Sequence, residues 1–167
     1  QNWSEYETVQ TLNEDWTLQF DTAFHGPSKP MQINKLFDWS TSENDSIKYY
    51  SGTATYTKTF IWNEDVSSQL LLNFEDINNI AEVKVNGKDV GVLWTYPFRI
   101  NISKALKKGT NALEVKVTNT WANRLIGDQA LPETERLTWT TASFRLEGNA
   151  LLKAGLLGDI KIIKHKK

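Results

Sequence analysis

Six side chains in the second half of the sequence have the types and spacing of a polar and aromatic binding site. They are Trp94, Tyr96, Trp121, Asn123, Arg124 and Asp128. A flat aromatic ring can lie under the apolar C–H face of a sugar ring, while amide, guanidinium and carboxylate groups form paired hydrogen bonds at its edge. These residues therefore predict a polar and aromatic ligand site of a kind that could suit a sugar, with no catalytic and no metal-ligating residue among them.

The same residues have other interpretations. Trp94 and Trp121 could be apolar plugs that close one end of a β-structure, because most of the seven Trp residues should lie in the core. Arg124 and Asp128 could form an ion pair that holds their loop in shape. Alternatively, this loop packs on a neighbouring domain, since ligand sites favour domain interfaces.

Alternating apolar and polar residues predict the strands that must position these side chains. Leu113, Val115 and Val117 alternate with polar residues, and the same period recurs at 16–20, 54–62, 70–74, 81–85, 89–94 and 98–102. A further strand is predicted at 157–163, a tight hairpin at Asn86-Gly87, and a single helical turn at 103–109. About eight strands without a long helix predict an all-β fold, an antiparallel jelly-roll-like β-sandwich.

Three stretches with weak strand patterning are predicted to be long loops, at 25–35, 38–51 and 119–135. Successive antiparallel strands reverse direction, so loops alternate between the two ends of a sandwich. Counting from the Asn86-Gly87 hairpin places the segments 38–51, 75–79, 95–97 and 119–135 together at the opposite end. We therefore expect all six candidate residues to share one rim.

Composition excludes several classes of protein. The 167 residues fit one domain, predicted to span 1–167, and the net charge of −1, from 19 basic and 20 acidic residues, argues against a nucleic-acid partner. There is no Cys, and the two His lack metal-site or triad spacing. No apolar run predicts a membrane span, so no membrane partner is expected. No cofactor is expected either. Because residue 1 is Gln, the chain is expected to be a processed product or a piece of a longer protein.

Several motifs, in order, resemble a known family. They are YYSGTATY at 49–56, AEVKVNG at 81–87, GVLW at 91–94, GTN at 109–111, NRLIGD at 123–128 and GLLG at 155–158. Together they resemble the sugar-binding-type, galactose-binding-like β-sandwich of family 2 glycoside hydrolases. The resemblance is greatest to the C-terminal module of family 106 α-L-rhamnosidases, and it extends over about residues 16–163.

The resemblance implies that hydrolysis belongs to a separate, larger domain of the same polypeptide. The chain would then be a non-catalytic accessory module, a C-terminal piece that binds carbohydrate, such as a rhamnose-containing glycan, or completes the catalytic pocket. Periplasmic or secreted localisation follows from the same resemblance.

Two rivals remain: an autonomous carbohydrate-binding module and a small stand-alone glycosidase. The second rival needs two carboxylates about 5 to 9.5 Å apart. Its candidates are Glu43, Asp45, Glu75, Asp76, Glu133 and Glu135. The oxygen-rich segment 42–46 is a weak calcium motif, because it lacks the spacing and the Gly of an EF-hand.

Overall fold

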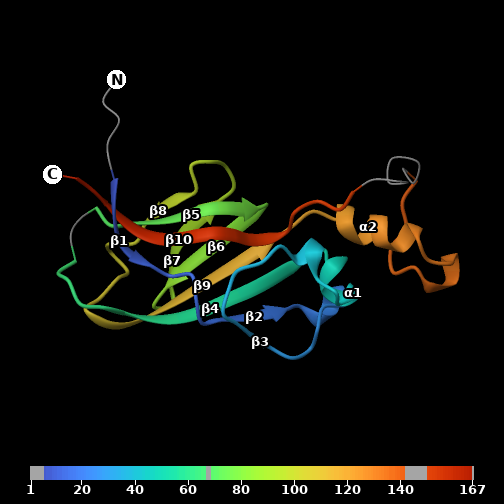
Figure 1. The fold of residues 1–167 in the computed structure, drawn as a ribbon, viewed down its shortest axis with the longest axis horizontal. Helices are drawn as coiled ribbons and strands as arrows, with labels where there is room; N and C mark the ends of the chain where they lie inside the picture. Colours follow the sequence, from blue (N-terminus) through green and yellow to red (C-terminus); the bar gives the residue numbers. More distant parts are fainter. Residues whose placement is uncertain (1–5, 67–68, 142–149, 167) are drawn as a thin grey trace, which may run out of the picture.

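The structure, a computed structural model, describes residues 6–66, 69–141 and 150–166. The described residues form a two-layer β-sandwich with short helices at one end (Figure 1). In chain order the elements are β1 (Tyr6–Thr11), β2 (Trp16–Phe20), η1 (Thr22–Phe24), β3 (Met31–Ile33), η2 (Trp39–Thr41), α1 (Asp45–Lys48), β4 (Thr53–Trp62), β5 (Leu71–Asn78), β6 (Ile80–Val85), β7 (Lys88–Leu93), β8 (Arg99–Asn101), β9 (Gly109–Thr118), α2 (Ala122–Gln129), η3 (Glu133–Glu135) and β10 (Gly155–His165).

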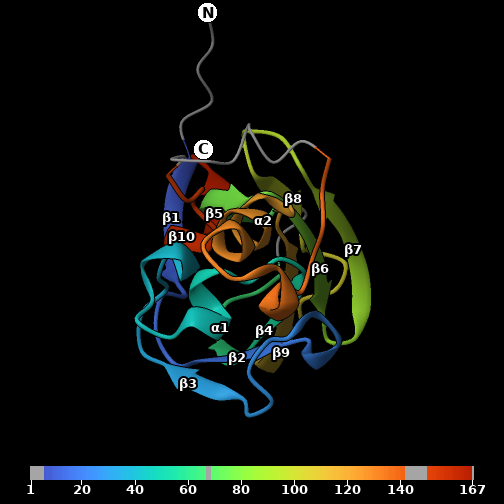
Figure 2. The same ribbon diagram turned by 90° about the vertical axis from the view of Figure 1, so that its right-hand side faces the viewer.

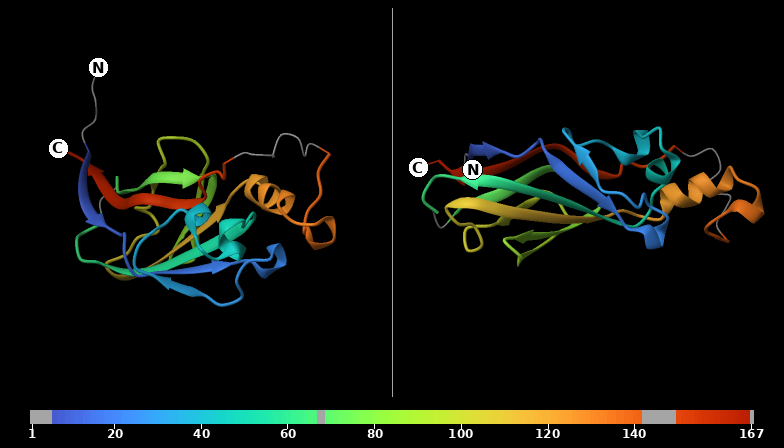
Figure 3. Two further views of the ribbon diagram at one scale, coloured as in Figure 1. Left: turned by 45° about the vertical axis from the view of Figure 1, so that its right-hand side comes forward. Right: turned by 90° about the horizontal axis from the view of Figure 1, so that it is seen from below.

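The strands pair into two antiparallel sheets. One sheet has the order β1-β10-β5-β8 and the other β3-β2-β4-β9-β6-β7. The two layers are visible in the left-hand view of Figure 3. The predicted fold class, an all-β antiparallel sandwich, is confirmed.

The pairing of β4 with β9 forms the centre of the larger sheet. Their register runs from Thr53 opposite Thr118 to Trp62 opposite Gly109. Along both strands, alternate side chains are buried, as the period-2 pattern predicts. Tyr56 lies at the middle of this core, and its hydroxyl accepts hydrogen bonds from Trp39 Nε1 (2.7 Å) and from the Leu156 amide (3.3 Å). Burial raises the pKa of Tyr56 far above its ordinary value.

The described residues contain two strands that the sequence pattern did not predict. The edge strand β1 buries no side chain fully, so its pattern carries no clear alternation. Strand β3 is three residues long and lies inside the stretch 25–35, predicted to be a loop. Conversely, Glu75 and Asp76 belong to β5 rather than to a loop.

The helices also differ from the prediction. The single turn predicted at 103–109 is present at its start, where the Ala105 and Leu106 amides both donate to the Ile102 carbonyl, and it does not extend into a helix. The stretch 119–135, predicted to be a loop, contains α2 and η3. Helix α2 was not predicted, for two reasons. The side chain of its N-cap residue, Trp121, forms no capping hydrogen bond, and Gly, here Gly127, disfavours helix. Within the described residues, no helix has both the length and the apolar character needed to cross a membrane.

Candidate functional site

Helix α2 projects from one end of the sandwich, where several connections meet. Seen from that end, it lies in front of the sheets, close to α1 (Figure 2). The Asn119 side chain joins the segment before α2 to the segment before β4, since it accepts from the Gly52 amide (2.9 Å) and donates to the Tyr50 carbonyl (2.8 Å). The amide of Asn79 donates to Thr118 O (3.1 Å) at the same end. Three of the four segments expected at this rim are therefore together.

Gly127 allows α2 to sit directly on the residue that ends α1. A Cβ atom at position 127 would lie 2.6 Å from Cγ and Cδ1 of Tyr49, closer than side-chain atoms normally approach. Only a residue without a side chain permits this packing. The Gly of the NRLIGD string thus has a structural role.

Asn123 anchors α2 to the segment that leads into β10. Its side chain is buried, donates to the Leu152 carbonyl (2.7 Å) and accepts from the Leu152 amide (2.8 Å). Both polar ends of the amide group are therefore used inside the protein. This geometry makes Asn123 a structural residue rather than a ligand contact.

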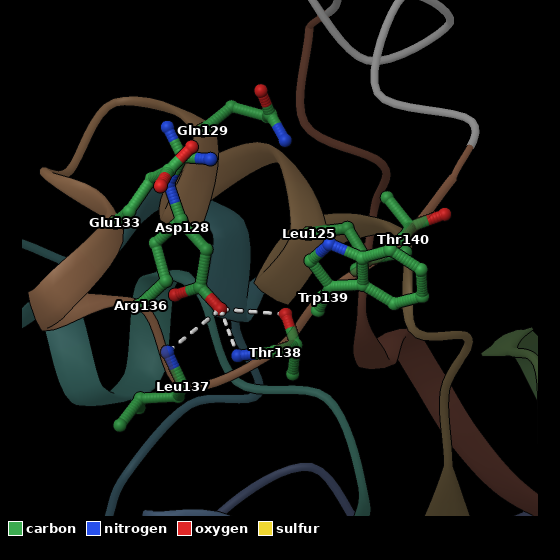
Figure 4. Close-up of a pocket in the computed structure, with 9 residues that line it drawn as sticks. All are labelled: Leu125, Asp128, Gln129, Glu133, Arg136, Leu137, Thr138, Trp139 and Thr140. Atoms are coloured by element: carbon green, nitrogen blue, oxygen red, sulfur yellow. Dashed lines mark hydrogen bonds between the residues drawn. The ribbon is translucent and has the colours of Figure 1, made fainter.

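Asp128 holds the chain that returns after η3. One carboxylate oxygen, Oδ2, accepts from the Leu137 amide (3.2 Å), the Thr138 amide (2.7 Å) and Thr138 Oγ1 (2.6 Å), as Figure 4 shows. The other oxygen lies 3.9 Å from Nη1 of Arg124. Asp128 is 2% exposed. The interpretation that Asp128 holds its own segment in shape is therefore correct.

Arg124 is buried at the base of α2 and differs from Asp128 in its bonding. Its backbone amide donates to Ser51 Oγ (3.1 Å), which fixes this turn of the helix on the start of β4. Its guanidinium has the ion pair with Asp128 as its one polar contact among the described residues. Most of its hydrogen-bonding capacity is therefore unused within the part of the chain that the structure describes.

The two Trp residues with alternative interpretations are not core plugs. Trp121 is 53% exposed and Trp94 is 71% exposed, whereas Trp16, Trp39 and Trp62 fill the core. Trp121 meets Phe24 of η1 edge to face, with ring centroids 6.1 Å apart. Both exposed indoles keep open faces on which a ligand can stack.

Trp94 and Tyr96 belong to a different segment from α2. They lie on the connection from β7 to β8, where the 74% exposed Tyr96 contacts Phe98 edge to face. This connection crosses from an edge of one sheet to an edge of the other. Neither cavity that α2 lines includes these two residues. Leu93 pairs with Ala81, and Ile80 pairs with Thr118, so the connection begins at the end of the sandwich that carries α2. That Trp94 and Tyr96 share one rim with the residues of α2 stays a prediction.

Two cavities flank α2. The η3 pocket, of about 500 Å³, lies between α2 and the chain that follows it, and Asp128, Glu133, Arg136 and Trp139 are among its lining residues (Figure 4). The η1 pocket, of about 180 Å³, lies between η1 and the start of α2. It is lined by Ala23, Phe24, His25, Ser51, Trp121, Arg124, Leu137 and Thr138.

A third cavity, of about 410 Å³, lies on the outer face of the larger sheet. Its described lining consists of residues such as Thr17, Thr57, Lys84 and Glu114, with no aromatic side chain. A sugar ring could form hydrogen bonds there but could not stack. The pockets beside α2 are therefore the better carbohydrate candidates. Among the residues that the structure describes, no group of three or more His, Cys, Asp or Glu could hold a metal ion.

Sequence reasoning missed the residues that complete these pockets, including Phe24, His25 and the 83% exposed Trp139. Strand counting could have placed Phe24 and His25, since β2 ends where its antiparallel partner β4 begins. Tyr50 connects these segments, because its hydroxyl accepts from the Asp21 amide (3.1 Å) and donates to the Thr53 carbonyl (2.7 Å). Burial raises the pKa of Tyr50 to about 12.

Comparisons with known proteins agree with this architecture. Residues 31–154 match the family described as glycosyl hydrolase 2 galactose-binding domain-like. A putative β-glucuronidase of Formosa agariphila is 39% identical over 88% of this chain. The structure of a rhamnosidase from Novosphingobium sp. PP1Y superposes with a TM-score of 0.88 at 34% identity over 96% of this chain. A β-glucuronidase of Ruminococcus gnavus has the same fold, with a TM-score of 0.66 at 19% identity, over 96% of this chain and 29% of its own.

The chain spans 15% of the length of the Formosa protein and 15% of the Novosphingobium chain. The resemblance that the motifs indicated, to family 2 sandwiches and to a rhamnosidase, is confirmed. The match of the family model over most of the chain, together with the shared fold, shows that this chain belongs to the glycosyl hydrolase 2 galactose-binding domain-like family.

Proposed function

We propose that the chain is a non-catalytic, carbohydrate-binding-like accessory module of a larger glycoside hydrolase. Its α2 end contacts the glycan or forms part of the wall of the catalytic pocket. The observation that carries this proposal is the pairing of open indoles with pockets: Trp121 lines the η1 pocket and Trp139 the η3 pocket. Exposed aromatic rings beside hydrogen-bonding groups are suited to sugar rings. The two relatives of which this chain spans 15% are named a putative β-glucuronidase and a rhamnosidase, which supports a role within a glycosidase.

The stand-alone glycosidase is less well supported. Its mechanism needs one carboxyl group that donates a proton and a second that acts as nucleophile or base. In the η3 pocket, Asp128 and Glu133 are two acidic lining residues, but Oδ2 of Asp128 already accepts three hydrogen bonds from Leu137 and Thr138. A carboxylate held in this way is suited to fixing a loop.

Two assays of the chain test the proposal. Incubation with a panel of aryl glycosides is expected to release no dye at any pH. Titration with rhamnose-containing and uronic-acid-containing oligosaccharides is expected to change the Trp fluorescence. Dye release would favour the stand-alone glycosidase over the accessory module.

The same changes in a full-length enzyme distinguish the module's two roles. Trp121→Ala and Trp139→Ala are expected to raise KM or lower kcat if this end faces the catalytic pocket. Unchanged kinetics with lost binding by the isolated chain would indicate an autonomous carbohydrate-binding module. Unchanged kinetics without any binding would refute the proposed function. We also propose, from the family resemblance, that the enzyme is periplasmic or secreted, which cell fractionation tests.

A further inference from the structure

The η1 pocket contains a buried cation without a matching set of acceptors. Arg124 is 8% exposed, and its guanidinium can donate five N–H bonds. Its single polar contact within the described residues is Asp128 Oδ1 at 3.9 Å, which is longer than a hydrogen bond. Among the described residues, that oxygen has no hydrogen-bond partner either. In the part of the chain that the structure describes, most of the guanidinium donors are therefore available to a ligand in the pocket.

The charge that faces the pocket favours an anionic partner. Arg124 lines it, and none of its described lining residues is acidic. The carboxylate of Asp128 lies outside this lining and is directed, through Oδ2, at Leu137 and Thr138. A planar guanidinium recognises a carboxylate through two parallel hydrogen bonds, which gives both strength and orientation.

The remaining lining fits a single sugar ring. Trp121 supplies an open aromatic face beside Phe24. Ser51 Oγ accepts from the Arg124 amide and keeps its own proton for an acceptor on the ligand. The volume of about 180 Å³ lies below the roughly 300–1,000 Å³ of pockets that enclose drug-sized ligands. One ring, at the end of a chain or as a branch, is therefore the expected occupant.

We propose that the η1 pocket binds one uronic acid residue, with its carboxylate on the Arg124 guanidinium and its C–H face on Trp121. This inference rests on the proposed function and names the class of sugar. A neutral pyranose would bring the guanidinium no charged acceptor besides Asp128, and a sulfated sugar would bring a tetrahedral anion in place of the planar carboxylate.

The direct test is calorimetric titration of the chain with methyl glucuronoside, methyl glucoside and glucose 6-sulfate. The glucuronoside is expected to bind at least tenfold more tightly than the other two, and more weakly as the salt concentration rises. Equal binding of methyl glucoside would overturn the carboxylate assignment. Equal binding of glucose 6-sulfate would overturn it as well, because the pocket would then recognise anions in general.

Variants locate the site. Trp121→Ala changes an exposed side chain and is expected to weaken glucuronoside binding about tenfold without unfolding the protein. Arg124→Lys keeps the charge but loses the planar fork, and a loss of similar size is expected. Trp94→Ala removes a more exposed indole that does not line the pocket, and it is the control for the loss of a Trp side chain. Loss of binding in the Trp94 variant but not in the Trp121 variant would overturn the assignment.

The outcomes separate this inference from the proposed function. If neutral rhamnose-containing oligosaccharides bind and the uronic acid does not, the uronate assignment fails while the accessory module stands. If no sugar binds and a full-length enzyme carrying Trp121→Ala keeps its kinetics, both fail.

Discussion

Replacement of Asp128 by Ala is expected to lower the free energy of unfolding by about 3 kcal/mol. The two bonds from Thr138, at 2.7 and 2.6 Å, are short and go to a charged acceptor. Such bonds contribute about 1.5–3 kcal/mol each, and the lower value applies because water can reach the half-buried Thr138. Two bonds at about 1.5 kcal/mol give about 3 kcal/mol. The longer bond from Leu137, at 3.2 Å, adds little because that residue is exposed.

Two further variants make the comparison specific. Asp128→Asn keeps one carbonyl oxygen for the Thr138 donors and is expected to lose about half as much stability. Glu133→Ala removes another acidic residue that lines the same pocket but is exposed, so a change within about 0.5 kcal/mol is expected. The measurement is urea unfolding followed by far-ultraviolet circular dichroism, with equal m-values as the condition for comparing midpoints.

Hydrogen exchange distinguishes global from local effects. If the chain after η3 detaches before the sandwich unfolds, the Thr138 amide should exchange faster in Asp128→Ala even where the urea midpoint moves less. An unfolding free energy within about 0.5 kcal/mol of the parent, together with unchanged exchange at Thr138, would show that the three hydrogen bonds do not hold this segment.

Three other changes test the packing of the sandwich and its end. Gly127→Ala should destabilise the protein by about 1–3 kcal/mol in urea unfolding, although Ala normally favours helix, because its Cβ would lie 2.6 Å from the Tyr49 ring. Tyr56→Phe should lower the unfolding free energy by about 1–3 kcal/mol and the melting temperature with it, since the buried Trp39 Nε1 loses its acceptor. Burial raises the pKa of Tyr50 from 10.0 to about 12, so the folded state keeps this proton longer than the unfolded chain. Its contribution is complete below pH 10 and is lost as the pH rises toward about 12, and urea midpoints measured with tyrosinate absorbance across that range should fall.

The sandwich was predictable because its strands bury alternate side chains. In β4 and β9 the buried residues, such as Tyr56 and Val115, occupy every second position, and this period is visible in the sequence. Helix α2 gave a weaker signal. The spacing of Arg124 and Asp128, four residues apart with opposite charges, is typical of a helix and could have indicated one. Gly127 and the absence of a capping residue at Trp121 instead indicated a loop.

Trp94 and Tyr96 show what strand counting cannot provide. Counting gives the end of the sandwich at which a strand stops, and β7 does stop opposite Ala81, near the end that carries α2. It does not say whether the next connection stays on the rim or leaves it. Here β7 and β8 are edge strands of different sheets, so their connection crosses the open side of the sandwich. Lateral position depends on the order of strands within the sheets, which a single sequence does not reveal.

The helical period explains how the NRLIGD string provides both structure and site. Residues four apart share a face of a helix, so Asn123 and Gly127 lie together and pack on the segments that contain Leu152 and Tyr49. Arg124 and Asp128 lie together on the neighbouring face, and they line the η1 pocket and the η3 pocket respectively. A substitution on the first face should therefore lower stability, whereas a change to the Arg124 guanidinium should alter binding first. On the second face the two roles meet, because Asp128 beside Arg124 also holds the chain that follows η3.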